Sequence, residues 1–507
     1  MKNTGTLSLR LNSADNVVVA RTEINRGTPI EGGALRAVET IPAGHKIAVE
    51  PIALGHAVIK YGSPIGIASR PIGLGQHVHT HNLKAALPES PAAIVRAAPA
   101  VVSAEFPFMF DGFRRPDGRV GTRNFVGVLT TVNCSATVAR MIANSFSQQH
   151  LDDYPGVDGV VALTHTSGCG MSTTGEGFDV LRRTLAGYAI HPNFAGVLIL
   201  GLGCEQNQVA ALLDDFRLRG RMHVEALVIQ DAGGTRACVA AGIERVTRLL
   251  RHAAEARRRP VPASELMLAL ECGGSDGYSG ISANPALGVA ADLLVAQGGT
   301  VVLSETPEII GAEHILIQRA ASSAIGQQLL DRIKWWRDYT SRHGVSVSDN
   351  PSEGNRAGGI TTIFEKALGA VAKAGFSPLQ AVYEYGQPID RRGLVFMDSP
   401  GYDPVAVTGQ VASGCNIVCF TTGRGSVFGC RPVPSIKLST NSALSRRMSD
   451  DVDIDCGGIV DGNESVQSVG RRIFEQLLAT ASGQPTCSEA LGFGSDEFVP
   501  WQLGAVL

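Results

Sequence analysis

Short apolar runs alternate with amphipathic segments along the chain from about residue 125 onward. The runs include "FVGVLTTVN" (125–133), "VDGVVALTHT" (157–166), "AGVLILGLGC" (195–204) and "VEALVIQD" (224–231). Between them, segments such as "SATVARMIANSF" and "IERVTRLLRHAAEARRR" carry apolar residues at helical spacing. Continuous apolar strands separated by helices are typical of a parallel sheet with helices on its faces. We therefore predict α/β structure with mostly parallel sheets.

A second series of apolar runs follows a basic, proline-containing segment, "EARRRPVPAS" (255–264). It comprises "LMLALEC" (266–272), "TVVLSE" (300–305), "GLVFMDS" (393–399), "NIVCFTTG" (416–423) and "PSIKLSTN" (434–441). The interruption indicates two α/β domains, over residues 111–258 and 259–507.

The first ninety residues have a different pattern, in which strand-like runs follow glycine turns roughly every ten residues. "IPAGHKIAVEP" (41–51), "IALGHAVIKYG" (52–62) and "IGLGQHVHTHN" (72–82) share an isoleucine, two intervening residues, a glycine and a β-rich run. This spacing predicts a small all-β domain over residues 1–90. Residues 91–110 are rich in Ala and Pro, and we interpret them as a linker.

Composition narrows the class of protein. A chain of 507 residues is too long for one hydrophobic core, so a multidomain protein is expected. A net charge of −3 gives no electrostatic attraction for nucleic acid or a membrane surface. The chain has no run of about 18 apolar residues, and polar residues interrupt its first twenty. We expect a cytoplasmic protein that binds neither nucleic acid nor membranes; assembly into a homo-oligomer is left open.

Three of the twelve histidines, His77, His79 and His81, lie two residues apart in "HVHTHN". In a continuous strand these side chains would share one face, and neutral imidazole is a common metal ligand. We predict metal ligation by His77 and His79, with His45 of "GHKIA" as the third ligand. His79, His81 and His165 of "THTSGCGM" are the candidate proton-transfer groups. The alternative is a surface strand that is polar on one side.

Most predicted strands end in a polar or glycine-rich phrase, and such ends form the ligand crevice of parallel sheets. We expect these phrases to share one crevice. Four of them carry a cysteine: Cys134, Cys169, Cys204 and Cys272. Ligation of iron by these thiolates, singly or in a cluster, is the alternative to a histidine site. Small buried cysteines that fill strand ends are the other interpretation.

Polar residues suited to hydroxyl and carboxylate groups also gather at these ends. The candidate substrate-binding residues are Arg123, Asn124, Ser275, Asp276, Asn284, Arg424 and Lys437. An arginine in a glycine-flanked turn can bind a carboxylate through two hydrogen bonds. For each single residue, turn formation or a surface ion pair is an alternative. Their grouping favours a small, multiply hydroxylated acid, whereas no complete GxGxxG or GxxxxGK[ST] motif indicates a nucleotide.

Several longer phrases resemble the altronate/galactarate dehydratase family: "VIKYGSPIG", "HVHTHN", "RPDGRVGTRN", "GLGCEQNQ", "ECGGSDGYSGISANP", "NPSEGNRAGGITT" and "TTGRGS". The resemblance covers nearly the whole chain, in order. It implies an N-terminal SAF domain of β-clip type and a hydro-lyase that uses Fe²⁺, or another divalent metal, to act on a sugar acid. The histidine phrase is more similar to the altronate branch, whose members form 2-dehydro-3-deoxy-D-gluconate. Galactarate dehydratase, sulfolactate sulfo-lyase and a non-catalytic sugar-acid-binding protein are the alternatives.

Overall fold

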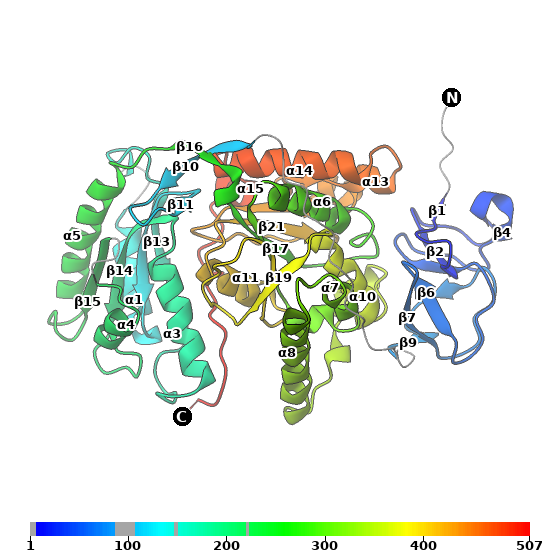
Figure 1. The fold of residues 1–507 in the computed structure, drawn as a ribbon, viewed down its shortest axis with the longest axis horizontal. Coiled ribbons are helices and arrows are strands. Elements are labelled where there is room, and N and C mark those ends of the chain that lie inside the picture. Colours follow the sequence, from blue (N-terminus) through cyan, green and yellow to red (C-terminus); the bar gives the residue numbers. More distant parts are fainter. Residues whose placement is uncertain (1–6, 87–106, 147–150, 220–222, 507) are drawn as a thin grey trace.

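The computed structural model describes residues 7–86, 107–146, 151–219 and 223–506. Figure 1 shows a β domain at one end of the long axis, a large α/β body in the centre and a smaller α/β body at the other end. The predicted fold class, a small all-β N-terminal domain followed by α/β structure, is confirmed. Most of the predicted linker lies outside the described residues.

The N-terminal domain consists of short antiparallel strands in three sheets. The first sheet has the order β1-β2-β5-β8, formed by Ser8–Leu9, Val17–Ala20, Lys46–Ala48 and His77–Val78. The second has the order β6-β7-β9, formed by Ala57–Lys60, Ser63–Ala68 and Leu83–Lys84. A two-stranded sheet joins β3 (Pro29–Ile30) to β4 (Leu35–Arg36). The repeated isoleucines pair with one another across the domain, Ile24 with Ile41 and Ile52 with Ile72.

The smaller α/β body contains a four-stranded parallel sheet of order β13-β12-β14-β15. Its strands are Gly159–Leu163, Phe125–Thr130, Phe194–Gly201 and His223–Val228. Alternate residues of β12 and β14 pack on opposite faces, against α1 (Ala136–Asn144) and α5 (Thr235–Ala253) or against α3 (Glu176–Ala189) and α4 (Val209–Asp215). These four strands and their helices agree with the apolar pattern of the sequence.

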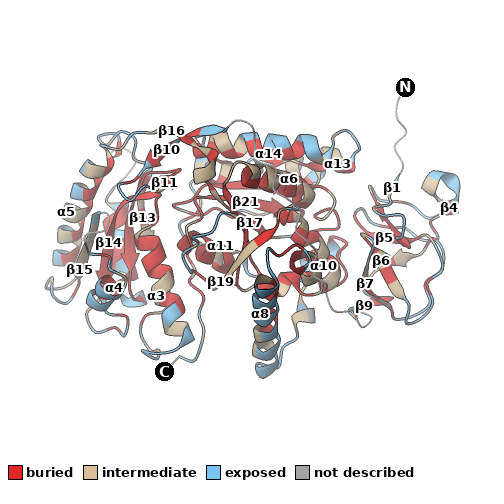
Figure 2. Cartoon of the chain, viewed as in Figure 1, coloured by how far each residue is buried: buried red, intermediate tan, exposed pale blue. Residues whose placement is uncertain are grey.

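The central body contains a seven-stranded parallel sheet of order β19-β20-β18-β17-β21-β22-β23. Its strands are Leu379–Tyr383, Gly393–Met397, Thr300–Leu303, Met267–Cys272, Ile417–Thr422, Ser435–Ser439 and Ile454–Asp455. Helices α6 (Ala283–Ala296) and α14 (Val466–Ala481) cover one face, and α11 (Asp403–Ala412) packs on the other. The remaining helices are α7 (Glu313–Ile317), α8 (Ser323–Arg342), α9 (Glu353–Ala357), α10 (Ile363–Val371), α12 (Ser442–Arg447), α13 (Gly457–Val460) and α15 (Cys487–Ala490). Helix α8 is exposed along its outer side (Figure 2).

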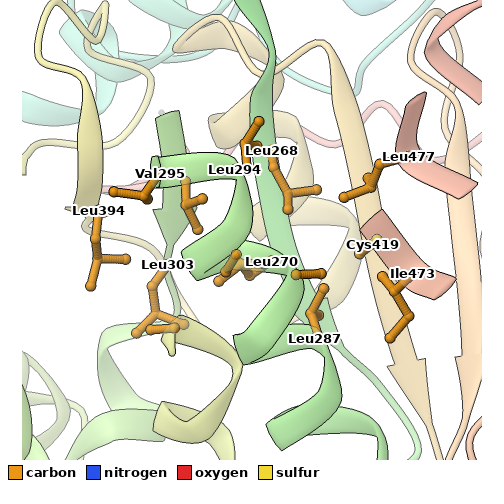
Figure 3. Packing of buried hydrophobic residues seen from close by; sticks show 14 of the residues in the cluster. Leu268, Leu270, Leu287, Leu294, Val295, Leu303, Leu394, Cys419, Ile473 and Leu477 are labelled. Atoms are coloured by element: carbon orange, nitrogen blue, oxygen red, sulfur yellow. The ribbon is translucent and has the colours of Figure 1, made fainter. Parts of the chain in front are cut away.

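The main core lies between the central sheet and helices α6 and α14. Leu268 and Leu270 of β17 meet Leu287 and Leu294 of α6 there, as Figure 3 shows. Because the side chains of a strand alternate, the next residues of β17, Ala269 and Glu271, point to the other face. The last two residues of β17, Glu271 and Cys272, therefore point to opposite faces of the sheet.

The two α/β bodies are joined by paired strands and by a shared hydrophobic core, in addition to the chain that connects them. Strand β10 (Met109–Arg114) pairs with β11 (Val120–Gly121) and with β16 (Arg259–Pro262), which lies in the basic segment that interrupts the apolar pattern. Helix α3 also packs on α11, so one hydrophobic core extends across both bodies. The strand-end phrases therefore belong to two different sheets, and the prediction that they share one crevice stays a prediction.

The histidine phrase differs from its predicted form. Strand β8 contains only His77 and Val78, and residues 79–82 form a turn in which Asn82 Oδ1 accepts a hydrogen bond from the His79 backbone N–H. The prediction of a continuous strand is therefore wrong, because Asn82 turns the chain. Within the described residues, no helix is long and apolar enough to cross a membrane.

Candidate active site at the contact between the β domain and the central body

A buried ion cluster connects the β domain to the central body. Lys46 of β5 and Lys60 of β6 both bind Glu365 of α10, with Nζ to carboxylate distances of 2.8 and 2.9 Å. All three side chains are at most 2% exposed. An unpaired charge at such a depth would cost several kcal/mol, so the two surfaces are matched by charge. Burial alone would raise the pKa of Glu365, but the two ammonium groups outweigh it and lower the pKa to about 2.

The local structure of α10 explains why Glu365 reaches the contact. Thr362 is the N-cap, and its hydroxyl accepts a hydrogen bond from the Glu365 backbone N–H, which fixes the first turn. The same hydroxyl donates to the carbonyl of Ile65 in the β domain. Burial lowers the pKa of Lys46 to about 8 even though Glu365 opposes this change.

Glycines allow the two backbones to approach closely at this contact. Gly44 has a φ of +81°, a conformation that side chains rarely adopt. A Cβ atom on Gly277 would lie 2.0 Å from the Gly44 carbonyl oxygen, and one on Gly359 would lie 2.5 Å from it. The glycine-rich phrases around residues 44, 277 and 359 are therefore used for close packing between domains.

Three imidazoles lie together beside this contact. His45 precedes β5, His77 is on β8, which pairs with β5, and His79 is in the turn that follows β8. His45 Nδ1 lies 2.9 Å from His77 Nε2, and one nitrogen from each of His45, His77 and His79 lies within 4.8 Å of the others. Burial, reinforced by the neighbouring rings and Lys46, lowers the pKa of His77 and of His79 to about 3. These rings are therefore neutral near pH 7, the form that binds metal ions.

Two further contacts attach the histidines to the central body. His79 Nδ1 lies 3.0 Å from the Thr361 hydroxyl, and His45 Nε2 lies 3.3 Å from the carbonyl oxygen of Ala357. Hydrogen bonds of this kind orient imidazole rings that serve as metal ligands. The histidine cluster, defined as His45, His77 and His79, is thus held by residues from both domains.

The other two candidate histidines lie outside this cluster. His81 is exposed, with its ring 5.2 Å from that of His77. His165 follows β13 in the smaller α/β body, where Nε2 lies 3.0 Å from the Thr130 carbonyl and Nδ1 accepts from the Ser167 backbone N–H. Both ring nitrogens of His165 are therefore used by the backbone around it.

A cavity of about 500 Å³ opens between the β domain and the central body. Ala357, whose carbonyl contacts His45, is part of its wall. Four arginines line it: Arg21, Arg424, Arg446 and Arg447. The buried Nε of Arg21 has no hydrogen-bond partner among the described residues. Guanidinium groups around a polar cavity suit a carboxylate-bearing ligand.

Asp276, Ser275 and Asn284 lie near this region. Asp276 lines the cavity and accepts hydrogen bonds from the Thr440 hydroxyl at 2.9 and 3.0 Å, and burial raises its pKa. Ser275 and Asn284 line a narrow pocket that also contains Lys60 and Glu365. The Asn284 amide donates to the Gly369 carbonyl and accepts from Thr421, so it already has partners.

Three of the candidate substrate-binding residues lie elsewhere and are bound internally. Arg123 forms two hydrogen bonds with Glu489, at 2.6 and 2.8 Å. The Asn124 amide donates to the carbonyls of Gly156 and Ala253, and Lys437 Nζ donates to the Phe428 carbonyl at 2.7 Å. None of the three lines the cavity.

The structure separates the four cysteines. Cys134, Cys169 and Cys204 are exposed and follow β12, β13 and β14 of the smaller body, whereas Cys272 is buried at the end of β17. In the described part of the chain, the first three join no group of three ligand atoms within 4.8 Å. A site that uses all four cysteines is therefore incompatible with this arrangement.

Sequence reasoning missed Lys46, Lys60, Thr361, Glu365 and Arg21. A signal was present for the two lysines, because "HKIA" and "VIKYG" place a lysine within an otherwise apolar strand. No local pattern distinguishes Glu365, which is more than 300 residues from both of its partners.

Comparison with known proteins gives matches along nearly the whole chain. Three family models match: the altronate/galactarate dehydratase SAF domain over residues 6–86, the second domain of D-galactarate dehydratase/altronate hydrolase over 112–254, and the C-terminal domain of D-galactarate/altronate dehydratase over 263–506. Altronate dehydratase of Bacillus subtilis (strain 168) is 37% identical over 486 residues, which cover 94% of this chain and 95% of that protein. Altronate dehydratase of Escherichia coli (strain K12) is 36% identical, covering 96% and 97%. Galactarate dehydratase (L-threo-forming) of the same organism is 37% identical, covering 94% and 93%.

Proposed function

The chain belongs to the altronate/galactarate dehydratase family, and from this premise we propose that it converts D-altronate to 2-dehydro-3-deoxy-D-gluconate and water. It is a sugar-acid dehydratase, a carbon–oxygen lyase. The observation that supports the proposal best is the histidine cluster, which lies beside an arginine-lined cavity between two domains.

The histidine cluster fits a divalent transition metal such as Fe²⁺. His77 and His79 are neutral near pH 7, burial also lowers the pKa of His45, and the ligand atoms of the three rings lie within 4.8 Å of one another. Imidazole nitrogen is a suitable ligand for iron. A bound metal would act as a Lewis acid, stabilising negative charge that develops on substrate oxygens.

The residues of the chain supply binding and proton transfer. Arg424 and Arg21 would bind the substrate carboxylate, and the polar wall around Asp276 would bind its hydroxyl groups. The reaction removes the proton from C2 and the hydroxyl group from C3, and the enol that forms becomes the 2-keto product. A histidine can accept the C2 proton and return a proton to the leaving hydroxyl. His81, whose ring lies 5.2 Å from that of His77, is the candidate in the β domain when His79 binds the metal, and His79 can take the role only if it does not. His165 stays a prediction without contact to the cavity.

Galactarate is a second candidate substrate. The chain is 37% identical both to an altronate dehydratase and to a galactarate dehydratase, so identity does not separate them. Galactarate carries a second carboxylate, and the cavity offers two further arginines, Arg446 and Arg447.

Turnover of a substrate panel tests the proposal. Anaerobic protein loaded with Fe²⁺ is incubated with D-altronate, galactarate, other aldonates and aldarates, and sulfolactate. We expect a 2-keto-3-deoxy product from D-altronate, whereas release of sulfite from sulfolactate alone would contradict the proposal. Recovery of every substrate unchanged would favour a binding protein.

A pair of arginine variants tests the cavity. Arg424→Gln would remove a charge-assisted hydrogen bond to the substrate carboxylate. We therefore expect kcat/KM to fall about tenfold to hundredfold. Arg471→Gln, on the exposed side of α14, is the matched control and should leave kcat/KM unchanged. Equal activity of both variants would exclude Arg424 from substrate binding.

A further inference from the structure

The three exposed cysteines lie at one edge of the sheet in the smaller α/β body. Cys134 follows β12, Cys169 follows β13 and Cys204 follows β14, each beyond the carboxyl end of its strand. Strand β12 lies between β13 and β14, and the three strands are parallel. Because neighbouring strands are about 4.8 Å apart, the three loops that carry the cysteines meet at this edge. None of the three cysteines lines the arginine-lined cavity.

These cysteines differ from the others of the chain in their exposure. Cys134, Cys169 and Cys204 are exposed, whereas six of the other seven cysteines are buried and Cys487 is partly exposed. Free cysteine is among the most buried residue types, because it usually behaves as a small apolar side chain. Thiols that react or bind metals must instead be accessible to their partner. The interpretation that a cysteine fills a tight strand end therefore does not account for the exposed three.

Hydrogen bonds from residues next to the cysteines hold the three loops together. The Asn133 backbone N–H donates to the Ser167 carbonyl at 3.0 Å, and the Asn133 side-chain amide donates to the His165 carbonyl at 3.1 Å. These bonds join the loop after β12 to the loop after β13. The Asn207 backbone N–H donates to the Gly168 carbonyl at 3.2 Å, which joins the loop after β14 to the loop after β13. The edge is therefore built by all three loops together.

A glycine and a buried carboxylate bring the same loops close to the end of β12. Gly168 has a φ of +99°, and a Cβ atom there would lie 2.2 Å from the Thr131 carbonyl oxygen, so a side chain does not fit. The Glu205 carboxylate, 3% exposed, accepts hydrogen bonds from the Thr131 hydroxyl at 2.8 Å and from the Gly203 backbone N–H at 2.6 Å. Each cysteine is thus next to a residue that fixes the position of its loop.

A buried side chain among these loops has an atom without a partner. Asn207 is 0% exposed, and its Nδ2 donates to the Thr131 carbonyl at 3.1 Å. Its Oδ1 has no hydrogen-bond partner among the described residues. A buried acceptor without a donor is costly, and native structures mostly avoid it. A ligand at this edge that carries a hydroxyl group or a bound water would satisfy Asn207 Oδ1.

The separation of the three sulfurs indicates what kind of metal group they fit. A bond from a thiolate to a single ion is about 2.3 Å long, so thiolates on one ion lie within about 4.6 Å of one another. In the described part of the chain, the three cysteines do not form a group of ligand atoms within 4.8 Å, unlike the histidine cluster. An iron–sulfur cluster binds each thiolate to a different iron, so its ligands are farther apart than those of a single ion. The arrangement therefore suits a cluster better than one ion.

We propose that Cys134, Cys169 and Cys204 ligate an iron–sulfur cluster of the four-iron, four-sulfide class. Each thiolate would bind one iron, which leaves the fourth iron without a protein ligand. In metal sites, a position that the protein leaves open is where water or a substrate binds. An oxygen ligand at the open iron lies within the three loops, where Asn207 Oδ1 can accept its hydrogen bond. This site is separate from the histidine cluster and does not depend on the proposed function.

Anaerobic reconstitution of the full-length protein with Fe²⁺, sulfide and a thiol reductant tests the site. Iron and acid-labile sulfide are measured per chain after desalting, and electron paramagnetic resonance spectra are recorded after reduction with dithionite. We expect about four sulfides per chain. Sulfide decides the outcome, because imidazoles bind iron without it, and the result is independent of turnover of any sugar acid. Protein that holds iron but no acid-labile sulfide would overturn the proposal.

Cysteine variants assign the cluster to these three residues. Cys134→Ala, Cys169→Ala and Cys204→Ala, made separately, should each lower the bound sulfide at least tenfold. They should keep the urea midpoint of the wild-type protein without cluster, because the replaced side chains are exposed. Cys487→Ala is the matched control, a partly exposed free cysteine of α15 in the central body, and should bind as much sulfide as the wild type. Equal sulfide in all four variants would show that iron sulfide binds non-specifically and would exclude the site.

Discussion

At the scale of single residues, burial and the nearest charges decide which protonation state a side chain has. His77 and His79 are kept neutral by burial and by the positive groups around them, and their lone pairs are therefore available. Glu365 is equally buried but is kept ionised by two lysines. Burial alone therefore does not decide whether a side chain is charged; the charges of the neighbouring groups do.

Separate replacement of the three neighbouring histidines should give unequal effects. We expect His77→Ala and His79→Ala to lose more than about 100-fold in kcat/KM together with bound Fe²⁺, because each would remove a metal ligand. His81→Ala should keep its iron, since His81 is exposed and lies outside the histidine cluster. Iron content and turnover, measured on the same samples, check this prediction. If all three variants keep wild-type iron content and turnover, residues 77–82 are a polar surface segment and not a metal site.

Acid should destabilise the protein partly through His191. This residue is 1% exposed, its Nε2 lies 2.9 Å from the Cys415 carbonyl, and burial lowers its pKa to about 3. An unfolded histidine titrates near pH 6.5, so the unfolded state binds the extra proton between these values and stability falls as the pH is lowered. The contribution is about 1.4 kcal/mol per pH unit below pH 6.5.

The matching experiment compares urea unfolding at pH 7 and pH 5. His191→Gln should lose less stability between the two values than the wild type does. His56→Gln, an exposed position, is the control and should keep the wild-type pH dependence. An unchanged pH dependence in His191→Gln would contradict the assignment.

At the scale of elements, short strands and one helix turn fix the domain contact. Strands β5 and β6 each present a lysine toward the first turn of α10, where the N-cap Thr362 holds Glu365 in place. Each element is only three to nine residues long. Their stability therefore depends on the contact itself, since isolated elements of this length are marginal.

Loss of the central carboxylate should weaken this contact strongly. Glu365→Gln leaves two buried ammonium groups without a negative partner, which costs about 3–5 kcal/mol. Hydrogen exchange should increase in β5 and β6, and the urea midpoint should fall. Glu353→Gln on α9, whose side chain is 92% exposed, is the control for charge removal in the same region. Equal midpoints for the two variants would contradict a structural role for the ion cluster.

At the scale of the whole molecule, the candidate active site belongs to neither domain alone. The histidine cluster comes from the β domain, while Arg424 and Asp276 come from the central body. The division into residues 1–90, 111–258 and 259–507 stays a prediction. The structure adds that β10 and β16, near the start of the last two units, pair with each other.

Separated fragments test the shared site. Residues 1–90 and 105–507 expressed as two chains should each be inactive, and mixing them should restore turnover. The control is a small fragment that carries His77→Ala and His79→Ala, which should not restore it. If residues 105–507 alone reach the full-length rate, the β domain is not part of the active site.

The sequence by itself determined the fold class and the order of the strands along the chain. Apolar runs such as 195–204 and 266–272 form buried parallel strands. A strand that is buried on both faces needs apolar residues at successive positions, and this pattern can be recognised locally. The isoleucine–glycine repeat likewise indicated the β domain. His45, His77 and His79 were grouped by chemistry before any geometry was known, and their role as ligands stays a prediction.

Only the tertiary structure decided which distant residues meet. It placed Glu365 on two lysines more than 300 residues away, separated Arg123, Asn124 and Lys437 from the cavity, and distributed the cysteines over two sheets. It also ended β8 at Val78, through the side chain of Asn82. Such pairings depend on how whole domains pack against each other. The sequence around a buried charged residue does not indicate which distant residue will neutralise it.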